Sequence, residues 1–129
     1  MYGFTMNGYF WEVKTVSSTS GVLIDRTNTK RVATTDPKTH KVYLSEDLLI
    51  DSSFLYRVLV HELSHCVIFS YNLFEEIHKM VYPEYWIEAE EFLCNFVADY
   101  GLTVFNIAKS YLGDAAIDII PKELERLVA

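Results

Sequence analysis

Cysteine is scarce in this sequence, which has only Cys66 and Cys94 among its 129 residues. A secreted domain of this size often carries several disulfides, so two cysteines favour a reducing compartment. The first eight residues also lack the basic segment and following apolar segment that are typical of a signal peptide. We therefore expect no signal peptide and predict a cytoplasmic location.

Basic residues and long apolar runs are scarce as well. The chain has 11 Lys and Arg against 18 Asp and Glu, which gives a net charge of −7. Nucleic acids and anionic membranes are both bound by clustered positive charge, so this balance argues against either partner. No uncharged apolar run approaches the length of a membrane span. Nothing in the sequence indicates an oligomeric state.

The chain does have ample material for a core, since 50% of it is hydrophobic and 15% is aromatic. Its length suits one compact domain over residues 1–129. The pattern indicates a β-rich part over 1–49 and a helical part over 50–129. We predict the α+β class, with a small N-terminal mixed sheet packed on one helix and a C-terminal helical layer after it.

Short alternating segments predict the strands and longer periodic ones predict the helices. The expected strands are Tyr9–Val16, Lys41–Leu44 and the weaker candidates Val22–Asp25 and Lys30–Thr35, with a turn at Asp36–Thr39. The expected helices run from about Asp51 to Tyr71 and over Leu73–Met80, Tyr85–Tyr100, Leu102–Leu112 and Pro121–Val128. We expect Gly101 to end the third helix.

The most informative feature is His61-Glu62-Leu63-Ser64-His65, inside the first of these helices. Two histidines four residues apart lie on one helix face, so both imidazoles can reach one metal ion. Glu62 is offset from that face and suits a general base. The helix is otherwise strongly apolar, and burying these polar groups without a partner is costly. The motif therefore predicts a metal site with His61 and His65 as ligands.

A catalytic zinc ion usually takes three protein ligands and leaves the fourth position for water. Ile68 and Tyr71 exclude the metzincin arrangement, which needs Gly and His there. A ligand from His78 is less favoured, because its short helix would have to fold back sharply. The acidic helix is the better source. Its candidates are Glu91 and, as runner-up, Glu88, with Asn95 and Asp99 as hydrogen-bond partners for a ligand and with Glu84 and Glu90 interpreted as solvated surface charges.

The segment Glu91-Phe92-Leu93-Cys94-Asn95-Phe96-Val97-Ala98 is similar to the Glu-x-x-Ala-Asn-x-Phe-Ala stretch of ImmA/IrrE-type metallopeptidases. These are small bacterial and phage proteins with a zincin, gluzincin-like pattern, and residues 40–100 carry the resemblance. It implies His61, His65 and Glu91 as zinc ligands and Glu62 as the catalytic base. The chain departs from the family at Cys94, Val97 and Ser64.

Two further features have a functional and a structural interpretation. In zincins an edge strand commonly pairs with an extended substrate, so Val42, Tyr43 and Leu44 are candidate substrate-binding residues. The alternative is an ordinary edge strand protected by Lys41. Cys66 and Cys94 lie near the expected ligands, and we interpret both as buried apolar residues.

These observations together predict a peptidase that uses one Zn²⁺ per chain and hydrolyses a protein or peptide substrate. Glu62 would be the general base for a metal-activated water. A second hypothesis is a regulatory or binding protein that keeps the zincin fold with little or no activity. A third is a structural protein without metal.

Overall fold

The computed structural model describes residues 1–113, and the expected helix Pro121–Val128 lies outside them. The chain divides into two compact units, Met1–Asp99 and Tyr100–Ala129. The first unit holds a sheet and three α-helices, and the second holds α4 (Leu102–Leu112). The expected α+β class with a mixed sheet is confirmed. The prediction of one domain over 1–129 stays a prediction.

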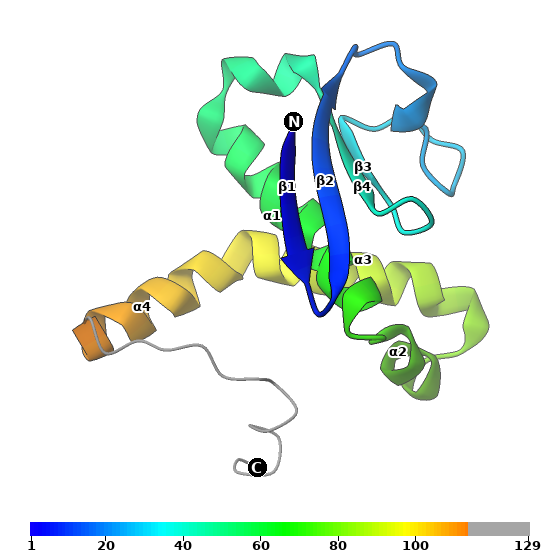
Figure 1. Ribbon diagram of the computed structural model, residues 1–129. Helices are drawn as coiled ribbons and strands as arrows, with labels where there is room; N and C mark the ends of the chain where they lie inside the picture. Colours follow the sequence, from blue (N-terminus) through cyan, green and yellow to red (C-terminus); the bar gives the residue numbers. More distant parts are fainter. Residues whose placement is uncertain (114–129) are drawn as a thin grey trace. The chain divides into compact units, whose positions relative to one another are not determined.

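The sheet has four strands in the order β1-β2-β4-β3 (Figure 1). β1 (Tyr2–Met6) and β2 (Tyr9–Val16) are antiparallel, β2 and β4 (Lys41–Ser45) are parallel, and β3 (Ala33–Asp36) is antiparallel to β4. β4 is therefore an inner strand and β3 forms an edge. The expected strand at Val22–Asp25 is wrong, because Gly21–Leu23 is a short 3₁₀ helix and Ile24 makes only an isolated bridge to Lys30.

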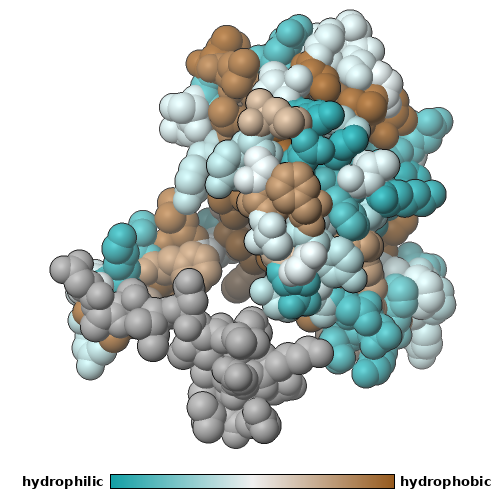
Figure 2. All heavy atoms as spheres, viewed as in Figure 1, coloured by the Kyte–Doolittle hydropathy of each residue, from teal (hydrophilic) through white to brown (hydrophobic). Residues whose placement is uncertain are grey.

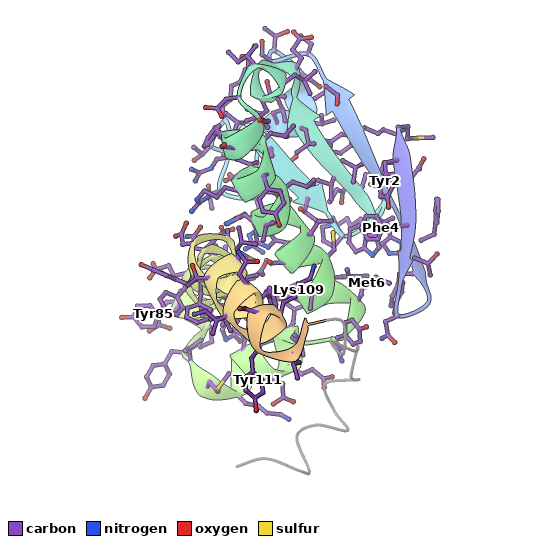
Figure 3. All side chains as sticks on the ribbon, turned by 90° about the vertical axis from the view of Figure 1, so that its left-hand side faces the viewer. Tyr2, Phe4, Met6, Tyr85, Lys109 and Tyr111 are labelled. Carbon is purple, nitrogen blue, oxygen red and sulfur yellow. The ribbon has the colours of Figure 1, made fainter. Side chains whose placement is uncertain are left out.

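β1 was not expected from the sequence, although its turn is recognisable. Asn7 and Gly8 both have positive φ, 48° and 84°, as a two-residue hairpin turn of type I′ requires. Phe4 and Met6 point from β1 toward α1 (Ser52–Ser70) and pack against the main core (Figure 3). Asn7 Nδ2 also donates to the carbonyl of Ser70 at 2.7 Å. The hairpin is thus attached to the end of α1.

α1 lies against one face of the sheet (Figure 1) and begins at a side-chain cap, where Asp51 Oδ1 accepts from the Phe54 N–H at 3.1 Å. Between helix and sheet lies the main core. Its buried members come from the sheet, from α1 and from the short 3₁₀ helix Glu46–Ile50 that precedes α1, and are Trp11, Ala33, Val42, Leu44, Leu48, Val58 and Cys66. Trp11 Nε1 donates to Ser70 Oγ at 3.0 Å, so this buried indole is satisfied. The core therefore fixes α1 with one face against the sheet.

α2 (Phe74–Met80) and α3 (Trp86–Phe96) follow α1, and α3 packs against both. A smaller core of Ile68, Ile77 and Cys94 joins the three helices. After α3 the chain forms a π-helical turn, Val97–Gly101. The expectation that Gly101 ends the helix is wrong, because its φ of −59° and ψ of −41° are helical and α4 begins directly after it.

Apolar side chains are not confined to the two cores. On the face seen in Figure 2, hydrophobic residues are interspersed among hydrophilic ones. In α4 several apolar side chains are exposed, among them Val104, Phe105, Ile107 and Tyr111. Within residues 1–113, no helix combines the length and apolar character that crossing a membrane requires.

Candidate metal centre

α1 carries the motif, and its packing decides where the motif side chains point. Glu62 is buried and His61 and His65 are half-buried, on the part of α1 that meets β3 and α3. The two Nε2 atoms lie 3.3 Å apart. The expected placement of both imidazoles on one helix face is thus confirmed, and their Nε2 atoms converge on one point.

α3 supplies the carboxylate that completes the group. Glu91 Oε2 lies 3.1 Å from His61 Nε2, and Glu91 Oε1 lies 3.3 Å from His65 Nε2. A tetrahedral ion with metal–ligand bonds of about 2.0–2.1 Å needs ligand atoms about 3.3–3.4 Å apart, close to these distances. His61, His65 and Glu91 are therefore a group that could hold a metal ion.

Glu90 is a correction to the sequence interpretation, which took it for a solvated surface charge. It is 5% exposed, and its Oε2 lies 2.5 Å from His65 Nδ1. A carboxylate on the second nitrogen of a metal-binding histidine fixes the tautomer and the ring orientation. Glu90 stands four residues after Trp86 and four before Cys94, on the apolar stripe of α3 that packs against α1. That stripe was the sequence signal for its burial.

The two residues expected in that supporting role lie elsewhere. Asn95 is exposed on the wall of the pocket, and among the described residues its side chain makes no hydrogen bond. Asp99 accepts a hydrogen bond from Arg57 Nε at 2.7 Å. Asn95 follows Glu91 by one turn of α3, and Asp99 lies further on, in the π-helical turn. The Nδ1 atom of His65 instead faces the helix interface, where Glu90 lies.

The other candidate ligands are not part of the group. Glu88 is exposed on α3. The ring of His78 stacks on Trp86 with a centroid distance of 3.6 Å. Cys66 and Cys94 are free and buried, and burial raises the pKa of the Cys66 thiol to about 12. Both cysteines are packed in the cores, as expected.

Glu62 lies beside the group without belonging to it. Its Oε1 accepts a hydrogen bond from Thr35 Oγ1 at 2.8 Å, and its Oε2 lies 3.9 Å from His61 Nε2. Burial raises the pKa of Glu62, against the lowering effect of the two histidines and Thr35. A carboxylate with a raised pKa is a better proton acceptor near neutral pH. Thr35 was not singled out from the sequence.

The electrostatics of the group favour positive charge between the imidazoles. Burial alone would lower the pKa of His65, but its contacts with Cys94, Glu90 and Glu91 outweigh burial and raise it. The histidines conversely lower the pKa of Glu91. A proton or a metal cation would satisfy the same carboxylates, so the two compete for this place.

The group lies in a pocket of about 1010 Å³. β3 runs along it, with Thr34, Thr35 and Asp36 in its lining, and the apolar side chains of the lining include Val22, Val32, Phe54 and Ile87. The expectation that the strand of Val42, Tyr43 and Leu44 is an edge is wrong, because β4 is paired on both sides. Tyr43 lies in the lining of the pocket, and substrate binding by these three residues stays a prediction. The hairpin through Pro37 places β3 outside β4, so β3 has the free edge.

Comparison of the chain with protein-family models, with curated proteins and with solved structures found no match.

Proposed function

We propose that this chain is a zinc-dependent peptidase of the zincin type, with His61, His65 and Glu91 as metal ligands and Glu62 as general base. The observation that supports it best is the convergence of the three ligand atoms beside a buried carboxylate that is not one of them. Two imidazoles and one carboxylate, with a fourth position open, are the ligand set typical of catalytic zinc.

When bound, zinc would polarise the scissile carbonyl and lower the pKa of a water molecule. The residues of the chain supply the proton transfer. Thr35 engages Oε1 of Glu62, which leaves Oε2 directed toward the ligand atoms and able to take a proton from water. The same carboxyl group can then give that proton to the leaving amine. The raised pKa of Glu62 suits both transfers.

The substrate we propose is an extended peptide segment. The free edge of β3 lies along the pocket that contains the ligands, and an extended peptide can pair with such an edge through main-chain hydrogen bonds. The side chain of Thr35 leaves this same strand to hold Glu62. Thr35 therefore connects the strand that would pair with the substrate to the proposed general base, Glu62.

The test is Glu62→Gln, with Glu88→Gln as the matched control. Both remove one carboxylate, but Glu88 is exposed and outside the group. The proteins are loaded with zinc and incubated with a peptide library from a cell digest, and cleavage is read by mass spectrometry. We expect Glu62→Gln to bind zinc as tightly as the wild type and to lose cleavage by at least about a hundredfold. Glu88→Gln should retain both zinc binding and cleavage.

Each other result points to a different conclusion. Equal cleavage by Glu62→Gln would refute the assigned base. A wild type that binds zinc but cleaves nothing would favour the second hypothesis, a binding or regulatory protein. A wild type that binds no zinc would contradict the metal site itself.

A further inference from the structure

Arg26 contacts the proposed metal centre, although it comes from the segment between β2 and β3. Its Nη1 donates to Glu90 Oε1 at 2.9 Å, and its Nη2 lies 3.5 Å from Glu91 Oε1. One guanidinium therefore spans two consecutive carboxylates of α3. The first contacts His65, and the second lies against both histidines.

The segment around Arg26 is itself held in place. Asp25 Oδ1 accepts from the backbone N–H groups of Thr27 and Thr29 at 2.8 and 3.0 Å. Asp25 Oδ2 accepts from Arg31 Nε at 2.7 Å. Thr27 Oγ1 donates to Asp25 Oδ1 as well, at 2.6 Å. A turn closed by four hydrogen bonds to one carboxylate restricts where the neighbouring Arg26 can reach.

We propose that Arg26 is a positioning residue of the metal centre. By holding Glu90 and Glu91 side by side, it sets the orientation of His65 through the first carboxylate and of the third ligand through the second. The planar fork of arginine suits this task, because two of its N–H groups point in fixed directions. This role presupposes the metal site proposed above.

The charge of Arg26 and its hydrogen-bond geometry have opposite effects on metal affinity. The positive charge of Arg26 repels a nearby cation, so removing the charge alone would strengthen metal binding. Removing the clamp would loosen two carboxylates and weaken metal binding. Glu90 and Glu91 already offset the charge of the guanidinium. We therefore expect the loss of the clamp to outweigh the loss of the charge, so that replacing Arg26 weakens metal binding.

The experiment compares zinc affinity in the full chain carrying Arg26→Met, Arg26→Lys or Arg57→Met. Arg57 is the matched control: it lines the same pocket and pairs with Asp99, 2.7 Å away, and its guanidinium makes no ion pair with the proposed ligands within residues 1–113. Affinity is measured by competition with a chromogenic chelator. The visible spectrum of the Co²⁺-loaded protein reports coordination geometry independently of activity, and circular dichroism confirms folding.

We expect both Arg26 variants to bind zinc about tenfold more weakly, with altered cobalt bands, and Arg57→Met to stay within about twofold of the wild type. Unchanged or tighter binding by Arg26→Met would overturn the role of Arg26 and leave the metal site standing. Full affinity in Arg26→Lys would also overturn it, because the planar fork of arginine would then not be needed to hold the two carboxylates. If the methionine variant does not fold, the lysine variant decides. A wild type that binds neither metal would remove the metal site, and the role of Arg26 with it.

Discussion

The two histidines of the proposed metal centre are held unequally. His65 has Glu90 on one ring nitrogen and Glu91 on the other. His61 has Glu91 near Nε2, whereas its buried Nδ1 has no hydrogen-bond partner among the described residues. Because buried polar atoms usually have partners, the orientation of His61 depends more on what its Nε2 binds.

This asymmetry makes Glu90 a sensitive position. Glu90→Gln keeps the size of the side chain but removes the charge that faces both His65 and Arg26. We expect zinc affinity to fall about 10–100-fold. Chelator competition measures the change, and Glu88→Gln is the matched control, since its exposed carboxylate contacts no ligand. Equal affinities of the two variants would show that Glu90 does not orient the ligand.

At the residue scale, the sequence predicted the side chains with a recognisable spacing. His61, Glu62 and His65 follow from helix geometry, and Glu91 follows from the acidic stripe and the family resemblance. Arg26 and Thr35 were not predictable in this way, because they reach the site from a turn and a strand far away in sequence. Contacts of that kind depend on tertiary packing, which periodicity does not report.

At the element scale, most ranges were predictable, but α3 ends at Phe96, four residues before the expected end at Tyr100. α1, α2, α4 and β2 lie within a residue or two of their expected ranges. β1 was missed although its turn, Asn7-Gly8, is a strong hairpin signal. The strand order could not be predicted from the sequence either, because a short weak strand such as β3 can pair on either side of its neighbour. The edge was therefore assigned to β4.

The hairpin turn gives a direct test of the β1–β2 pairing. Gly8 has a φ of 84°, whereas Gly21 has no positive φ, and an added Cβ would meet open space at either position. Gly8→Ala should lower the free energy of unfolding by about 1 kcal/mol, because L-residues are strained at positive φ. Gly21→Ala should change it little. Urea denaturation of both variants measures the difference, and equal stabilities would contradict the turn geometry.

The turn that carries Arg26 should depend on pH through Asp25. Burial alone would raise the pKa of Asp25, but hydrogen bonds from Thr27, Arg31 and Thr29 outweigh it and lower the pKa. A lowered pKa contributes stability above the pKa of the unfolded state, about 3.9, and this stability is lost as pH falls toward the folded value.

Asp25→Asn should therefore be less stable than the wild type by about 1 kcal/mol at pH 7, and this difference should shrink as pH falls from 5 to 3. Thermal melts of both proteins at pH 7, 5 and 3 measure it. A difference that stays constant over this range would mean that the charge of Asp25 does not support the turn.

At the scale of the whole molecule, the proposed ion would connect α1 to α3 and add stability to the folded state alone. At free zinc about 100 times above the dissociation constant, the gain is about 2.7 kcal/mol, or about 10 °C in melting temperature. The gain should shrink as pH falls, because zinc must displace a proton from His65, whose pKa is raised. Differential scanning fluorimetry measures it.

Two variants give this measurement its controls. The double variant His61→Ala/His65→Ala should show no zinc-dependent rise, because two of the three ligands are gone. Glu62→Gln should keep the rise, since Glu62 is not a ligand. A rise that persists without the histidines would place zinc elsewhere on the molecule.

The division of the centre between two helices also has a consequence for synthesis of the protein. Glu91 leaves the ribosome 26 residues after His65, and α3 must dock on α1 before its carboxylate reaches the imidazoles. Under the proposed chemistry, a nascent chain thus carries its base and two histidines without a working hydrolytic centre. If the proposed activity holds, neighbouring unfolded chains would be protected from premature cutting until folding is complete.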